Sequence, residues 1–411
     1  MDRRRVVITG TGVISPLGNT VKELYARLRN GESGVRKMRE WKDSGPVPLA
    51  APVELEEALV KSIPRMYRRS MGRVGVFAAL AARSAVEQAG VEKSMLTDGR
   101  CGCVIGSTMG GSGSISETYH LLLGNRKDEI SAMQFFKSVS HTAAFNVANW
   151  FGIRGCVLSP SAACASALQA IGVGRDLIAS GTQDLVLCGG AEELAPEVPV
   201  SFELIEASGG FDHAHPEKAS RPFDAERRGL VCGEGAGIVM LESLEHARKR
   251  GAEILGEIRG YATCASGSAL SQSDASAILR CLELVYRDAG VEPACTDYVS
   301  AHATSTIQGD REEAAALRKF FGDSVPVSSL KGHLGHTLGA SGGIELIATL
   351  EMAARSELLP TLNLEHPDEE CGSVDLIRGI RPREIRFFLK NSFAFGGINA
   401  TLLCSRYCDS F

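Results

Sequence analysis

The chain has 411 residues, of which 44% are apolar and 23% charged, as expected of a globular protein with two or three domains or one large duplicated fold. Its net charge of −5, without a basic stripe, argues against a general nucleic-acid binder, and no apolar run reaches the ~20 residues of a membrane span. The twelve cysteines are scattered, several within apolar runs, so we expect apolar fillers in a reducing cytoplasm, with neither disulfides nor a metal site.

Segments typical of strands and of helices alternate along the whole chain, which predicts an α/β protein. The expected strands are 5–9, 103–106, 184–188, 237–241, 257–263, 298–301, 325–328, 385–390 and 400–405. The expected helices are 76–89, 145–150, 165–179, 275–289, 311–321 and 342–354. The periodicity weakens over 195–222, and we expect irregular surface there.

A boundary near residue 252 divides the chain into two halves. A charged helix is expected to begin at Ser243 and to end in basic residues, with Gly251 as its stop. We therefore assign an N-terminal half to 1–252 and a C-terminal half to 253–411. The halves show no obvious sequence repetition and no low-complexity linker separates them, so we expect them to pack as one body.

Cys164 is the most informative residue, because small residues flank it and a helix-forming run follows at once. A strand-like piece, Cys156-Val157-Leu158, precedes it, so the thiol is expected at a turn that leads into a helix N-terminus. Unpaired N–H groups and the positive end of the helix dipole favour a thiolate there, and the thiolate is the nucleophile. The alternative is a small buried apolar residue, the usual role of an unpaired cysteine.

Two histidines in the C-terminal half lie among small residues and hydroxyls, as they would where a backbone passes close to a ligand. His302 follows a short expected strand, and His336 lies in a glycine-rich segment five residues after Lys331. An isolated histidine is more often a surface or core residue than a functional one. What favours a functional role is the order of these residues ahead of the segment Phe393-Ala394-Phe395-Gly396-Gly397-Ile398-Asn399, because that order resembles a known family.

This order of motifs resembles that of the β-ketoacyl-acyl-carrier-protein synthases, the elongating condensing enzymes of the thiolase superfamily. The likeness runs from 7–12 through 189–192 and 220–224 to 391–393. It implies a thiolase-like, five-layered αβαβα fold of two pseudo-duplicated halves, the first carrying the nucleophilic cysteine and the second both catalytic histidines. It also implies a dimer, since a neighbouring subunit completes the acyl pocket in this family.

The resemblance implies a Cys-His-His mechanism, in which Cys164 would accept an acyl chain from a carrier-protein thioester. Malonyl carrier protein would then lose carbon dioxide, while the N–H donors of His302 and His336 stabilise charge on its thioester oxygen. The carbanion would attack the acyl-cysteine, with the backbone N–H groups of Cys164 and Phe395 facing the tetrahedral oxyanion. No cofactor is expected, because phosphopantetheine arrives on the carrier protein.

Further roles follow from positions that match the family's motifs. Lys331 would organise charge around the histidines, with Glu345 or Asp310 as its carboxylate partner. His333 matches no catalytic position, and Phe395 would be the gating residue that moves when an acyl group enters. The alternative for each of these residues is a structural position without a catalytic role, at the surface, in the core or in a turn. The expected substrate-binding residues are Met109 near the floor of the acyl pocket, Ser271, Thr304 and Thr306 along the phosphopantetheine channel, and Phe393.

Two alanines depart from the family's pattern, since Ala303 after the first histidine and Ala394 in the gating loop both replace glycine. An added methyl restricts the backbone, so we expect an effect on gating or pocket shape. Lys137 and His141 fall in a region that borders the acyl pocket and the dimer interface in the family. If either reached the pocket, the acyl group could carry polar or aromatic functionality; a solvated surface position is the simpler alternative.

Three other protein classes were weighed. A thiolase would need a second cysteine in 395–399, which has none, and an initiating ketoacyl synthase would show asparagine in place of His336. A non-catalytic chain-length partner of a heterodimeric ketosynthase generally lacks the nucleophile. We therefore expect an elongating synthase of fatty-acid or of polyketide or polyene assembly. Its expected partners are acyl carrier protein, malonyl carrier protein and either a second copy or a related subunit.

Overall fold

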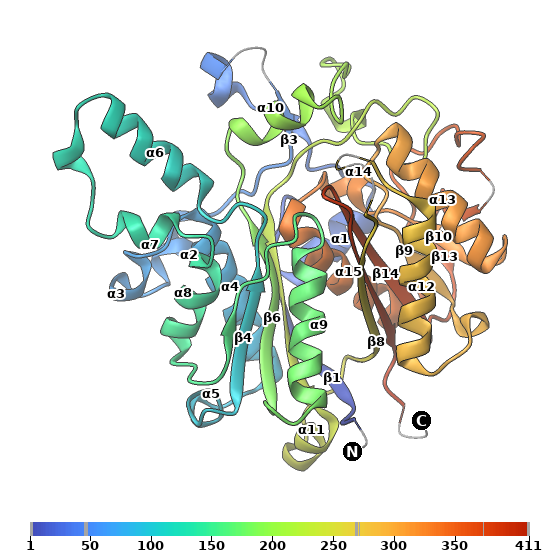
Figure 1. Cartoon of the computed structure of the whole chain (residues 1–411), viewed down its shortest axis with the longest axis horizontal. Helices are drawn as coiled ribbons and strands as arrows, with labels where there is room; N and C mark the ends of the chain where they lie inside the picture. The colour runs from blue at the N-terminus through green and yellow to red at the C-terminus, as the bar shows by residue number, and fades with distance from the viewer. Residues whose placement is uncertain (1–2, 45–47, 268–269, 271, 373, 409–411) are drawn as a thin grey trace.

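A computed structural model describes residues 3–44, 48–267, 270, 272–372 and 374–408 (Figure 1). Its main feature is a mixed sheet of 11 strands. In sheet order the strands are β12 (Asp375–Leu376), β10 (Pro326–Ser328), β9 (Tyr298–Ser300), β14 (Phe387–Ala394), β15 (Ile398–Ser405), β8 (Gly256–Ala265), β1 (Val6–Ile14), β7 (Gly235–Ser243), β6 (Leu185–Glu192), β4 (Cys101–Gly106) and β5 (Val157–Leu158).

The sheet repeats one pattern twice. In the first half the order β1-β7-β6-β4-β5 has two antiparallel pairings followed by two parallel ones. The order β8-β15-β14-β9-β10 in the second half has the same sequence of pairings. Short antiparallel pairing between β1 and β8 joins the two sets, which confirms the predicted duplication of halves. The exact boundary at residue 252 lies between the helix that ends at Arg250 and β8, and stays a prediction.

Helices cover both faces of each half. The central pair, α9 and α15, contacts strands of both halves and lies between them, whereas α4 and α8 cover the outside of the first half and α12 and α13 the outside of the second (Figure 1). This arrangement is the expected five-layered αβαβα fold. These helices are α4 (Arg73–Ala89), α8 (Thr142–Phe151), α9 (Ser166–Ala179), α12 (Ala275–Ala289), α13 (Ile307–Phe321) and α15 (Ser341–Arg355).

All nine expected strands and all six expected helices are present, with ends shifted by a few residues. The expectation of irregular surface over 195–222 is wrong in part, because α10 spans Glu197–Leu204. Pro196 and Pro199 weakened the helical signal, yet proline is tolerated before and within a first turn. The other elements are α1 (Val21–Arg29), α2 (Glu57–Lys61), α3 (Arg65–Arg68), α5 (Lys93–Thr97), α6 (Ser112–Leu123), α7 (Gln134–Ser138), α11 (Leu244–Arg250), α14 (Lys331–Leu334), β2 (Arg36–Lys37), β3 (Leu49–Ala50), β11 (Glu357–Leu358) and β13 (Arg381–Pro382).

Two glycines let the central helix α15 lie directly against the sheet. A Cβ added to Gly343 would stand 2.3 Å from the carbonyl oxygen of Gly237 on β7, a distance no side chain can occupy. This contact fixes the depth of α15, which carries Ser341 and Glu345 into the interior. Within the described residues, no helix is both long and apolar enough to cross a membrane.

Candidate active site

Cys164 lies at the turn between β5 and α9, as expected, and is only 5% exposed. The residue before it, Ala163, has a φ of 45°, in the left-handed region that costs an L-residue roughly 1–2 kcal/mol. The hydroxyl of Ser166 holds this turn by donating to the carbonyl of Ala163 at 2.7 Å and accepting from the N–H of Ala162 at 2.9 Å. The strained turn therefore aims the thiol at the interior, at the start of α9.

His336 lies just before α15, and its Nε2 is 2.9 Å from the sulfur of Cys164. Its Nδ1 is 2.9 Å from the hydroxyl of Ser341, which also accepts from the hydroxyl of Thr337 at 3.2 Å. The Ser341 proton is therefore free to be donated to Nδ1, and in that tautomer the ring proton is on Nε2. His336 then directs an N–H group at the cysteine sulfur.

His302 follows β9 and packs edge-to-face against His336, with ring centroids 5.3 Å apart. The carboxylate of Glu313 holds this loop by accepting from the backbone N–H groups of His302 at 2.9 Å and Ala303 at 2.7 Å. Within the described part of the chain, Nδ1 of His302 is buried without a hydrogen-bond partner. The side-chain nitrogen and sulfur atoms of Cys164, His302 and His336 lie within 4.8 Å of one another.

Burial controls the charge of all three groups. It lowers the pKa of both His302 and His336 well below the ordinary value, and the ammonium of Lys331 lowers both further. Both rings are therefore neutral near pH 7 and can act as N–H donors. Two imidazole nitrogens and one sulfur would also suit a zinc ion, so the expected absence of a metal stays a prediction.

The expectation that the helix N-terminus makes Cys164 a thiolate is wrong for the free protein. Burial raises the pKa of Cys164 to about 12, although the charge of Lys331 and the backbone N–H groups of Cys164 and Phe395 act to lower it. The desolvation of a buried thiolate outweighs these contributions. The two N–H groups nevertheless face the sulfur, where the resemblance assigns an oxyanion site.

A buried ion cluster lies behind the histidines. Nζ of Lys331 is 2.7 Å from Oε1 of Glu345, and Lys390 pairs with the other oxygen of the same carboxylate. Glu345 is thus the predicted partner of Lys331, whereas Asp310 was the wrong candidate. Asp310 accepts from the N–H groups of Phe223 and Ser305 and faces a buried arginine. The sequence analysis missed Lys390, whose only signal was a lysine within an apolar strand.

A narrow cavity of about 30 Å³ opens onto the three reactive groups. Thr304, Thr306, Phe393 and Phe395 line it as expected, and Ser273 is an additional polar lining residue. The space holds little more than a water molecule, so an acyl chain cannot enter without movement of its walls. Its full lining is Cys164, Leu230, Ser273, His302, Ala303, Thr304, Thr306, Gly309, Glu313, His336, Phe393 and Phe395.

The remaining candidates lie elsewhere. Met109 is 42% exposed and, like Lys137 and His141, is absent from the described cavity lining, so its role at the acyl pocket stays a prediction. His141 is exposed with its ring 5.5 Å from that of Phe145. Ser271 lies outside the described residues.

His333 is buried and directs Nδ1 at the carbonyl of Glu32, 3.0 Å away, and Nε2 at the carbonyl of Pro360, 3.3 Å away. Both ring nitrogens are thus engaged by backbone, which agrees with a non-catalytic histidine.

Comparison with known proteins agrees with the fold and with the predicted family. Residues 3–247 match the family model described as the N-terminal domain of beta-ketoacyl synthase, and residues 255–365 match that of its C-terminal domain. The 3-oxoacyl-[acyl-carrier-protein] synthase 2 of Coxiella burnetii is 37% identical over 420 residues, which cover 100% of both chains.

Two solved structures extend this likeness. A beta-ketoacyl synthase from Burkholderia phymatum superposes with a TM-score of 0.94 at 39% identity, over 98% of this chain and 100% of that one. The second is AntDE:AntF, described as a type II polyketide synthase acyl-carrier protein in complex with its ketosynthase bound to the hexaketide. It superposes with a TM-score of 0.89 at 30% identity, over 99% of this chain and 100% of that one. Since both halves match the family's models and the relatives are similar over their whole length, this chain belongs to the β-ketoacyl synthase family.

Proposed function

We propose that this chain is an elongating β-ketoacyl-acyl-carrier-protein synthase, with Cys164 as the nucleophile. The observation that carries the proposal is the approach of Cys164 to His336 and His302, within 4.8 Å in a buried cavity. A non-catalytic chain-length partner is the alternative, and the presence of all three groups in contact counts against it. Both fatty-acid and polyketide pathways fit this chemistry.

In the first half-reaction the sulfur of Cys164 attacks the carbonyl of an acyl carrier-protein thioester. The backbone N–H groups of Cys164 and Phe395 face the sulfur and can donate to the tetrahedral oxyanion. The carbon–sulfur bond to the phosphopantetheine then breaks, and the proton of the Cys164 thiol ends on the departing sulfur. The buried thiol is protonated at rest, so proton transfer must accompany the attack.

In the second half-reaction the malonyl group loses carbon dioxide, and its electron pair moves onto the thioester oxygen as an enolate. His336 directs an N–H group into the site, and His302 lies against it with an unpartnered buried nitrogen. Neutral imidazole donors stabilise the developing oxyanion without being acids strong enough to quench the carbanion. The carbanion attacks the acyl carbonyl on Cys164, whose sulfur leaves as a thiolate and then takes a proton from water.

Phe395 fits a gating role, because it follows β14 on a turn and packs against Phe202, with centroids 5.9 Å apart. Its backbone N–H faces the nucleophile and its ring lines the closed cavity, so one residue couples entry of the acyl group to the reacting atoms. Ala303 lines the same cavity and Ala394 directly precedes Phe395, so both methyls lie where gating would be affected.

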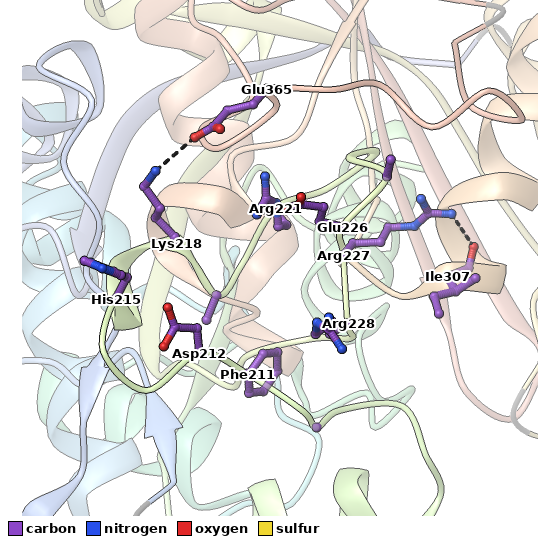
Figure 2. A pocket seen from close by; sticks show the side chains of 13 residues that line it. Phe211, Asp212, His215, Lys218, Arg221, Glu226, Arg227, Arg228, Ile307 and Glu365 are labelled. Atoms are coloured by element: carbon purple, nitrogen blue, oxygen red, sulfur yellow. Dashed lines mark hydrogen bonds and ion pairs between the residues drawn. The ribbon is translucent and has the colours of Figure 1, made fainter.

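We further propose that the carrier protein docks over a larger cavity of about 830 Å³ next to the active site (Figure 2). The two cavities adjoin, since Ile307 of the larger one follows Thr306 of the smaller one in the chain. Next to them, the N–H of Gly229 donates to the carbonyl of Ser305 at 2.9 Å. Arg228 lines this cavity, is exposed, and has no ion-pair or hydrogen-bond partner in the described chain. Its guanidinium suits the phosphate of a phosphopantetheine arm.

We also propose that the chain is a dimer formed at β5. This edge strand has no neighbour on its outer side among the described strands, and its two residues, Val157 and Leu158, are 40% and 42% exposed. Leu123 at the end of α6 is 85% exposed and Phe135 on α7 is 69% exposed. An exposed edge strand, together with exposed apolar side chains on helices of the same half, favours a surface that another subunit covers.

Replacing His336 by alanine is expected to separate the two half-reactions. Cys164 should still take up an acyl group, because the backbone oxyanion donors remain. Malonyl decarboxylation should fall by about 10²–10³, the usual loss on removing one oxyanion donor. Intact-protein mass measures the acylation of Cys164, and carbon dioxide release measures decarboxylation. Both are measured in EDTA, because the mechanism uses no metal ion. His333→Ala is the control, and a wild-type decarboxylation rate in His336→Ala would contradict the mechanism.

Reversing the charge of Arg228 tests the docking surface. Arg228→Glu is expected to raise KM for malonyl carrier protein by about tenfold with little change in kcat, since an interfacial charge mainly affects encounter. KM for a short malonyl thioester without the phosphate should stay within about twofold of wild type. Lys249→Glu on α11, at the opposite end of the molecule, is the matched control (Figure 1). Equal effects on both substrates would refute docking at this cavity.

Sedimentation tests the dimer. The wild-type chain, of 43.7 kDa, is expected to sediment at twice that mass, and Leu158→Asp should shift it toward the monomer because a buried carboxylate would face the partner. Leu204→Asp, at a side chain 79% exposed on α10, should leave the dimer intact. A wild-type monomer at micromolar concentration would oppose a homodimer and favour the related-subunit alternative.

A further inference from the structure

Lys390 is a second fully buried lysine next to the active site, and the mechanism above does not use it. It lies in the middle of β14, where it is opposite Leu402 of β15 and Ser300 of β9. Its side chain is 0% exposed, as is that of Lys331. A buried ammonium is strongly unfavourable unless other groups compensate its charge, so its surroundings define its role.

Three oxygens surround the Lys390 ammonium. One belongs to the Glu345 carboxylate, with which it forms an ion pair. The other two are the backbone carbonyls of Ala301, at 3.2 Å, and Ser300, at 3.4 Å, to which it donates. Those carbonyls end β9 immediately before His302. Lys390 therefore ties the strand that leads to the gating loop to the strand that carries a catalytic histidine.

Lys331 and Lys390 each take one oxygen of Glu345, so two ammonium groups share a single carboxylate. A second carboxylate, that of Glu313, faces Lys390 from α13 and also accepts from the N–H groups of His302, Ala303 and Asn391. The ionisable groups that face Lys390 are Glu345, Lys331, Glu313, His302 and His336.

We infer that Lys390 is a positioning residue of the condensation site: it orients Glu345 and the end of β9, and its positive charge favours the enolate formed on decarboxylation. A positive charge in a region shielded from water acts most strongly when a negative charge develops nearby. The same charge helps to keep His302 and His336 neutral, as N–H donors. This inference rests on the proposed function and adds a residue to it.

A purely structural role is the competing explanation. A lysine that only linked β14 to β9 would affect the stability of the fold, and its removal would lower the amount of folded enzyme. It would leave kcat per folded molecule and the pH profile unchanged. Rates must therefore be normalised to enzyme whose fold has been checked by thermal melting.

Lys390→Met, which keeps most of the side-chain length and removes the charge, is expected to lower kcat for malonyl decarboxylation by about tenfold or more, with KM for malonyl carrier protein unchanged. Acylation of Cys164 should change less. Lys390→Gln, which can still donate to the carbonyls of Ser300 and Ala301, should show the same loss, since it restores the link without the charge. Leu389→Met, on the same strand, controls for repacking.

The pH profile supplies a second readout. Burial lowers the pKa of Lys390 to about 8, although Glu345 raises it, so the wild-type rate should fall as the ammonium loses its proton above that pH. The fall should vanish or move to higher pH in Lys390→Met. A variant that matches wild type in kcat and pH profile would overturn the inference. If the wild type itself fails to decarboxylate malonyl carrier protein, the proposed function fails instead. If Lys390→Met does not fold, the inference is tested by kcat of Lys390→Gln and by the pH profile of the wild type.

Discussion

Burial of the Cys164–His336 contact is the constraint on which the rest of the site depends. The two residues come from different halves of the chain, and their sulfur and nitrogen atoms meet 2.9 Å apart, away from water. Burial keeps both imidazoles neutral, and a neutral imidazole can still donate one N–H group to an oxyanion. It also keeps the thiol protonated, so reactivity has to come from nearby N–H groups and positive charge.

The duplicated architecture explains how this contact forms. Each half contributes one helix to the central layer, and each helix begins just after a reactive residue: α9 after Cys164 and α15 after His336. Both N-termini therefore converge on the site, where their partial positive charge favours an anion. His302 reaches the same place from the end of β9, held by Glu313. The reactive groups thus come from both halves and meet at the interface between them.

Next to this interface, Glu345 on α15 forms ion pairs with two buried lysines. Its carboxylate joins Lys331, before His336, to Lys390, on the strand that leads to Phe395. The segment before His336 and the strand that leads to the gating loop are consequently joined through one buried carboxylate. Such a network is rigid when fully paired, and removal of one member leaves the others uncompensated.

Local patterns in the sequence were sufficient for nine strands, six of the longer helices and the turn at Cys164, because periodicity and helix signals act over a few residues. Motif order added His302, His336 and Lys331. The ion-pair partners of the buried lysines could not be predicted, because they depend on contacts between residues far apart in the sequence. Asp310 and Glu345 were equal candidates for Lys331 until the fold brought Glu345 to it, and Lys390 pairs with a residue on another element.

The thiolate expectation failed for the same reason. The helix start at Cys164 is a local feature that the sequence reveals, whereas the desolvation that outweighs it comes from packing of both halves around the sulfur. The helix α10 was missed because two prolines suggested a break, although both lie where a helix accepts them.

The central claim, that Cys164 carries the acyl chain, is tested most directly by peptide mass spectrometry after incubation with an acyl carrier protein. The account predicts the acyl mass on the peptide that contains Cys164, and on no other. Half-buried Cys264 is the alternative site, because contact with the side chain of Cys281 lowers its pKa below the ordinary cysteine value. Acylation at Cys264, or no acylation in active protein, would contradict the account.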